Sequence, residues 1–195
     1  MNRVAGLTLA IAVLVFAAQA QAQDQTRTFD VVGSAPQVCN IDRPSLGDRP
    51  PVNVQALDGS NLRIVSLVDP RTLATAATSV EVSMAAICTV PHRLTVESQS
   101  NGLWRAQASG VGGAPGFTSA VPYTLDIEWG EARERVDADA LSRGRNQRTA
   151  FIDGATVGDL TLLLTIQPGA SNQFANAPLL AGVYADTLTV TLEPQ

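Results

Sequence analysis

The feature of this sequence that most restricts its fold is a strict two-residue alternation of side-chain character, clearest near the C-terminus. Across residues 184–192 the even positions are Tyr, Asp, Leu, Val and Leu, and the odd positions are Ala followed by threonines. Successive side chains of a β-strand point to opposite faces, so a period of two indicates a strand. Threonine suits such a strand, because its branched Cβ fits the pleat and its hydroxyl can face water. Residues 184–192 are therefore predicted to be one strand with its apolar face in the core.

The same alternation recurs in short runs along most of the chain. The clearest runs are residues 80–84, 94–97, 123–129 and 160–166. Pairs that favour turns separate them, including Asn101-Gly102 and Pro168-Gly169. Helix signals are weak and are confined to residues 73–78 and to the charged, ambiguous residues 132–141. Several short strands separated by turns predict an all-β sandwich or barrel.

The N-terminus has the layout of a secretory signal peptide. A basic start at Arg3 precedes an apolar run over residues 4–18, and small residues follow at Ala18, Ala20 and Ala22. The apolar run of about 15 residues is shorter than the roughly 20 that a membrane helix needs. We therefore expect residues 1–22 to be cleaved as a signal peptide, with an uncleaved anchor as the alternative. Residues 23–195 are predicted to form a single β-sandwich domain, exported without a membrane span.

The sequence has two cysteines, Cys39 and Cys88. Export delivers them to an oxidising compartment, where an even pair is expected to form a disulfide. The enclosed loop of about 50 residues gives roughly 4 kcal/mol of stabilisation in the chain-entropy model. A zinc site is disfavoured, since His92 is the sole histidine and no second cysteine pair completes a tetrahedral set. We predict no metal and no cofactor.

Charge and composition argue against several classes of function. The formal net charge is −5, which disfavours nucleic-acid binding because that requires concentrated positive charge. Every basic residue is an arginine, so lysine Schiff bases and P-loop lysines are excluded. The single histidine, His92, is interpreted as an exposed or hydrogen-bonded turn residue, and the acid pair Asp137 and Asp139 as part of a solvated loop. We therefore predict that the protein is not an enzyme.

Three segments together resemble the spore coat protein U-like family, relatives of chaperone–usher pilus subunits. The first is residues 28–32, which lead to Val-Cys-Asn-Ile at residues 38–41, and the second is residues 87–98 around Cys88. The third is the ending at residues 180–192, whose Gly182-x-Tyr184-x-Asp186-Thr187-x-Thr189-Val190 core is the most specific. Residues 46–78 and 131–157 match no part of the family pattern.

The resemblance implies an immunoglobulin-like, pilin-like sandwich that lacks its final strand. A periplasmic chaperone fills the resulting groove, and at the usher the N-terminal strand of the next like subunit replaces it by β-strand addition. On this interpretation Phe29 and Val31 are the donor side chains. The groove would be lined around the last strand by Tyr184, Leu188, Val190 and Leu192. The protein would then be a pilus (fimbrial) subunit with a role in cell adhesion, located in the periplasm, on the outer surface or outside the cell.

Two alternatives remain open at this point. Pro36 interrupts the donor segment and cannot donate to a ladder, so residues 28–32 are alternatively an ordinary first strand of a closed sandwich. The protein would then be a stand-alone secreted sandwich that binds a ligand such as a glycan. In that case Trp104 and Trp129, with Tyr123 and Tyr184, are candidates for stacking on sugars.

Overall fold

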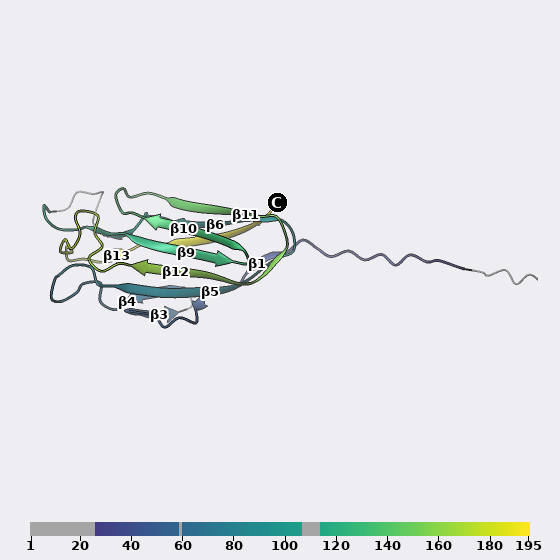
Figure 1. Ribbon diagram of the computed structural model, residues 1–195, viewed down its shortest axis with the longest axis horizontal. Helices are drawn as coiled ribbons and strands as arrows, with labels where there is room; N and C mark the ends of the chain where they lie inside the picture. Colours follow the sequence, from purple (N-terminus) through teal and green to yellow (C-terminus); the bar gives the residue numbers. More distant parts are fainter. Residues whose placement is uncertain (1–25, 59, 107–113) are drawn as a thin grey trace, which may run out of the picture. The chain divides into compact units, whose positions relative to one another are not determined.

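The structure is a computed structural model that describes residues 26–58, 60–106 and 114–195 (Figure 1). The predicted signal peptide, residues 1–22, lies outside this part of the chain. The chain divides into two units, residues 1–35 and residues 36–195. Described residues 26–35 of the first unit form no strand or helix, and their side chains are exposed. Among the described residues there is no helix long and apolar enough to cross a membrane.

The second unit is all-β, and its largest sheet has the order β1-β5-β12-β9-β10. These strands are β1 (Cys39–Ile41), β5 (Thr78–Cys88), β12 (Thr156–Ile166), β9 (Tyr123–Trp129) and β10 (Ala132–Ala138). A further strand, β2 (Ser45–Leu46), also pairs with β5. All of these pairings are antiparallel, and Figure 1 shows β5, β12, β9 and β10 in this order.

A second sheet, with the order β11-β6-β14, packs against the first. Its strands are β11 (Asn146–Ile152), β6 (His92–Ser98) and β14 (Leu188–Pro194). Two smaller pieces complete the unit. The first is the sheet of β13 (Tyr184–Ala185), β7 (Leu103–Arg105) and β8 (Ala120–Val121), and the second is the hairpin of β3 (Val54–Asp58) and β4 (Asn61–Ile64).

The core lies between the two large sheets, and the alternating residues supply it as predicted. Leu125, Ile127 and Trp129 of β9 are buried in one cluster with Leu94 and Val96 of β6. Their neighbours along each strand point outward and are more exposed. The prediction of an all-β, disulfide-linked fold is confirmed, and the two sheets are consistent with a sandwich.

The charged segment at residues 132–141, ambiguous in the sequence, is largely strand β10. Arg135 forms an ion pair with Asp126 of β9 at 2.9 Å, and Arg133 pairs with Glu128 at 3.2 Å. The inward-facing Val136 is fully buried. Cross-strand pairs of opposite charge favour a ladder, so the charges that obscured the pattern support the outer face of the sheet. Residues 73–78 form turns and the start of β5 instead of a helical turn.

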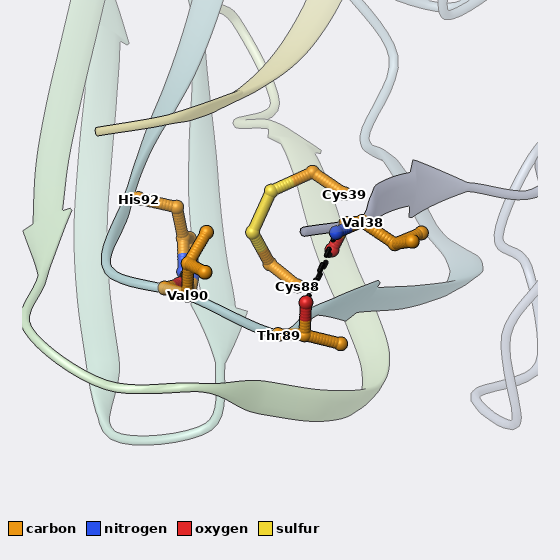
Figure 2. Close-up of a disulfide and its surroundings, with 6 residues drawn as sticks. All are labelled: Val38, Cys39, Cys88, Thr89, Val90 and His92. Carbon is orange, nitrogen blue, oxygen red and sulfur yellow. Dashed lines mark hydrogen bonds between the residues drawn. A yellow bond between two sulfur atoms is a disulfide. The ribbon is translucent and has the colours of Figure 1, made fainter. Parts of the chain in front are cut away.

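The disulfide joins Cys39 and Cys88, which face each other across the β1–β5 ladder with their Cα atoms 4.1 Å apart. Next to it, the Val38 amide donates to the Thr89 hydroxyl at 3.0 Å (Figure 2). His92 is completely buried and lies 4.8 Å from the Trp129 ring, measured between ring centres. Its Nδ1 is 2.8 Å from the Val90 carbonyl oxygen. A carbonyl can only accept, so Nδ1 carries the proton. This histidine is a hydrogen-bonded core residue.

The predicted single strand over residues 184–192 is in fact two strands. Residues 184–185 belong to β13 and pair with β7, whereas β14 begins at Leu188 and pairs with β6. The break lies at Asp186, an even position whose side chain points inward as the alternation requires. Its carboxylate accepts hydrogen bonds from Ser98, Ser100, Tyr123 and Thr187, so the chain leaves one sheet at this residue and joins another.

Candidate functional site

The sandwich is closed along one side and only partly closed along the other, where β1 contacts part of β14. On the closed side, β10 and β11 are consecutive in the chain and contact each other across the two sheets. On the other side, the outer edge of β5 is covered by β1, by β2 and by a bridge between Val52 and Ser79. Within the described ranges, no strand pairs with the outer edge of β14. An unpaired edge of this kind is a template for pairing with another chain.

The register of β14 identifies the backbone groups that this edge presents. The Gln99 amide donates to the Thr187 carbonyl at 3.0 Å, and the Gln195 amide donates to Pro91 at 2.9 Å. Hydrogen-bonded pairs recur at every second residue of an antiparallel ladder. Thr189 and Thr191 therefore bond to β6. The amide and carbonyl groups of Leu188 and Val190 point toward the open edge.

A largely apolar cavity of about 540 Å³ lies beside this edge, between the two sheets. This volume is within the range of about 300–1,000 Å³ typical of ligand pockets. The apolar residues that line it come from most strands around the opening: Pro44, Leu46, Val54, Ala56, Leu62, Ile64, Val80, Val82, Met84, Leu103, Leu125, Leu162, Leu164, Leu188 and Val190. We call this cavity the groove.

The β14 residues of the groove are less buried than their neighbours on β6. Leu188 and Val190 point into the sandwich, yet they are only half-buried. Their cross-strand neighbours Val96 and Ser98 on β6 are almost completely buried. Residues with the right orientation for a core thus lack the layer that would cover them.

One part of the groove is polar and is built around Asp186. Its carboxylate accepts from the Ser98 hydroxyl at 2.6 Å and from the Tyr123 hydroxyl at 2.7 Å. It also accepts from the backbone amides of Ser100 at 2.9 Å and Thr187 at 2.7 Å. Burial of Tyr123, together with its bond to Asp186, raises the pKa of this tyrosine well above its ordinary value. The hydroxyl therefore stays protonated, and the carboxylate is engaged in holding the chain at the β13–β14 break.

The structure brings some of the predicted site residues together and separates others. Leu188 and Val190, two of the residues predicted for an acceptor groove, line the cavity. Leu192 packs against the core farther along β14, and Tyr184 lies on β13 with its hydroxyl donating to the Leu180 carbonyl at 2.8 Å. Neither of these two residues borders the cavity.

The predicted donor residues lie in the first unit. Phe29 and Val31 have residue exposures of 86% and 85%, respectively. They belong to the described residues 26–35, which form no strand.

Sequence reasoning missed two parts of the groove. The first is Asp186, whose signal was an acidic residue at an inward position of an otherwise apolar alternation. The second is the β3–β4 hairpin, which contributes Val54, Ala56, Leu62 and Ile64 to the lining. Its segment matched no family pattern, and nothing in its residues indicates which part of the sandwich it borders.

The two tryptophans considered for sugar stacking lie outside the groove. Trp104 and Trp129 are each only 1% exposed, so neither presents a face on which a sugar could stack. In the part of the chain that the structure describes, no group of three or more His, Cys, Asp or Glu residues is arranged to hold a metal ion. The groove thus offers a surface for binding, formed by apolar side chains and an open backbone edge.

Comparison of the sequence with models of known protein families and with curated proteins finds no match.

Proposed function

We propose that the protein is an exported structural subunit of a surface fibre of the pilus type, assembled by β-strand addition between like subunits through a chaperone–usher-like pathway. The observation that carries this proposal is the coincidence of two features at one place. The apolar inner face of the sandwich is uncovered at the groove, and β14 presents unpaired backbone groups along the same opening.

A β-strand is the ligand whose chemistry fits both features. Its backbone would pair with the outward amide and carbonyl groups of Leu188 and Val190. Its alternate side chains would enter the groove and complete the core. A small apolar molecule would cover the side chains but would leave the backbone edge unpaired, so the site favours a strand.

The donor that we propose is the segment at residues 28–32 of another copy. Phe29 and Val31 are two positions apart and would point into the groove together, whereas Val32 would face away. All three side chains are exposed in the structure, and residues 26–35 form no strand of their own. This favours a donor over a first strand of a closed sandwich. Pro36 then marks the end of the pairing segment, because it has no amide to donate.

The proposal is tested by placing one charge on each face of the donor. We would purify residues 23–195 with Val31→Asp, with Val32→Asp and without substitution, and measure assembly by gel filtration and native electrophoresis. We expect the unsubstituted chain and Val32→Asp to form multimers, and Val31→Asp to remain unassembled. A synthetic peptide of residues 26–35 should bind to the Val31→Asp chain.

The matched pair makes the outcome specific to side-chain direction. Both substitutions replace an exposed valine by the same acid, so a general effect on solubility changes both variants alike. Equal assembly of the two variants would contradict the proposed donor. An unsubstituted chain that stays monomeric and binds no peptide would contradict the function itself and would favour a stand-alone secreted protein.

A further inference from the structure

The β3–β4 hairpin has an apolar face that borders the groove. Val54 lies opposite Ile64 in the hairpin register, and Ala56 lies opposite Leu62. Directly paired residues and their neighbours two positions away share one face, so these four side chains form a single surface. All four line the groove, whereas Leu57 does not. A strand lying in the groove would therefore contact the hairpin as well as β14.

The hairpin is attached to the rest of the unit mainly at its base. In the described residues, the hydrogen bonds of β3 and β4 run between these two strands and within their connecting turn. At the base, the Asn53 side chain donates to the Ser66 carbonyl at 2.6 Å and to the Thr78 hydroxyl at 3.0 Å. The Ser66 amide in turn donates to the Asn53 side chain at 2.9 Å. We call this set of bonds the Asn53 clamp.

The geometry at Asn53 is suitable for a hinge. Its φ of 60° lies in the left-handed region, which asparagine tolerates better than most residues. Hinges of mobile segments are typically a few residues at the ends of elements that absorb the change in backbone angles. At the opposite end, Asp58 accepts bonds from the amides of Ser60 at 3.0 Å and Asn61 at 2.9 Å, which keeps the two strands together as one body.

The apolar face of the hairpin is incompletely covered. Val54 and Ile64 are half-buried, and Leu62 is 42% exposed although it points toward the groove. This partial exposure is what a surface shows when the layer that it packs against is missing. A strand in the groove would supply that layer.

We propose that the β3–β4 hairpin is a hinged flap that turns at Asn53 and closes its apolar face over a strand bound in the groove. The inference rests on the proposed function and adds a means of retaining the strand. The flap must open before a strand can leave, so its contacts govern the dissociation rate. The Asn53 clamp holds the flap at its base and so restricts its opening. The clamp therefore also limits how fast a strand can enter the groove.

The retention part is tested with the Val31→Asp chain, whose own donor segment is disabled, and a fluorescent peptide of residues 26–35. Dissociation is followed by anisotropy after addition of excess unlabelled peptide. We expect Leu62→Ser to speed dissociation by at least about tenfold, equivalent to about 1.4 kcal/mol. Leu57→Ser is the matched control, because it removes the same side chain from a hairpin position outside the groove, and it should leave the rate within about twofold.

The hinge is tested by removing the clamp with Asn53→Ala. We expect association and dissociation to accelerate together, each by at least about threefold, because a loosened base opens more often in both directions. A fixed wall instead predicts an unchanged association rate, and that result would overturn the hinge.

The outcomes separate this inference from the function on which it rests. Tight peptide binding with equal dissociation rates for Leu62→Ser and Leu57→Ser would overturn the flap and leave the proposed function standing. No peptide binding to the Val31→Asp chain would overturn both. Circular dichroism of each variant confirms that it keeps the β-sheet spectrum of the parent chain.

Discussion

Replacing Asp186 with alanine is expected to destabilise the sandwich by about 4 kcal/mol. The carboxylate accepts bonds from the hydroxyls of Ser98 and Tyr123, from the amides of Ser100 and Thr187, and from the more distant Gly102 amide. Hydrogen bonds to a charged group contribute roughly 1.5–3 kcal/mol each, and a buried donor left unpaired costs about 1–3 kcal/mol. Members of one network do not add independently. The expected loss is therefore well below the sum of the five bonds.

Asparagine at the same position should cost less, about 1–2 kcal/mol. The two amides of Ser100 and Thr187 approach the same oxygen, Oδ1, which asparagine retains. The other oxygen, replaced by an NH₂ group, faces the hydroxyls of Ser98 and Tyr123 and, at the longer distance of 3.4 Å, the Gly102 amide. A hydroxyl can accept as well as donate, so both hydroxyls can turn to receive the new donor. The Gly102 amide can only donate, so its long bond is lost in both variants.

Urea unfolding of the Val31→Asp chain, which is expected to stay unassembled, measures both losses when the Asp186 substitutions are made in that background. The buried side chains of Trp104 and Trp129 provide the fluorescence signal. We expect the free energy of unfolding to fall in the order unsubstituted, Asp186→Asn, Asp186→Ala. An alanine variant within about 1 kcal/mol of the unsubstituted chain would refute the reasoning. So would equal losses for the two variants, because the distinction depends on which donors are able to reverse.

Two further predictions concern stability. Burial, and then the bond to Asp186, raise the pKa of Tyr123 above its ordinary value near 10, so the folded chain holds this proton more tightly than the unfolded chain. This contribution is present below about pH 10 and is lost at higher pH; Tyr123→Phe should flatten that alkaline decline in urea titrations. Replacing Cys39 and Cys88 together by serine removes a link between residues separated by 49 positions. This change should lower the free energy of unfolding by about 4 kcal/mol. An unchanged free energy of unfolding would show that the two thiols are free in the unsubstituted chain.

The all-β class could be predicted from the sequence because core burial imposes a period of two on each strand. The alternation over residues 123–129 placed Leu125 and Ile127 inward without any knowledge of their partners. The cysteine pairing also followed from composition, since only two cysteines are present. These features depend on local pattern or on counting.

The break at Asp186 and the position of the β3–β4 hairpin could not be predicted in this way. The two-residue alternation of inward and outward side chains continues through Asp186, because the Asp186 side chain does point inward. Only the donors around it, from Ser98 and Tyr123 far away in the sequence, show why the strand ends there. The groove lies beside an edge of β14 that pairs with no strand among the described residues, and a strand pattern does not reveal which edges are paired.

Amide hydrogen exchange along β14 tests the central claim most directly. The chain is the Val31→Asp variant, measured by NMR with and without the peptide of residues 26–35. We predict that the amides of Leu188 and Val190 exchange rapidly in the free chain and become protected when the peptide binds. Those of Thr189 and Thr191, already bonded to β6, should be protected throughout. Bound peptide with unchanged exchange at Leu188 and Val190 would contradict strand addition at this edge.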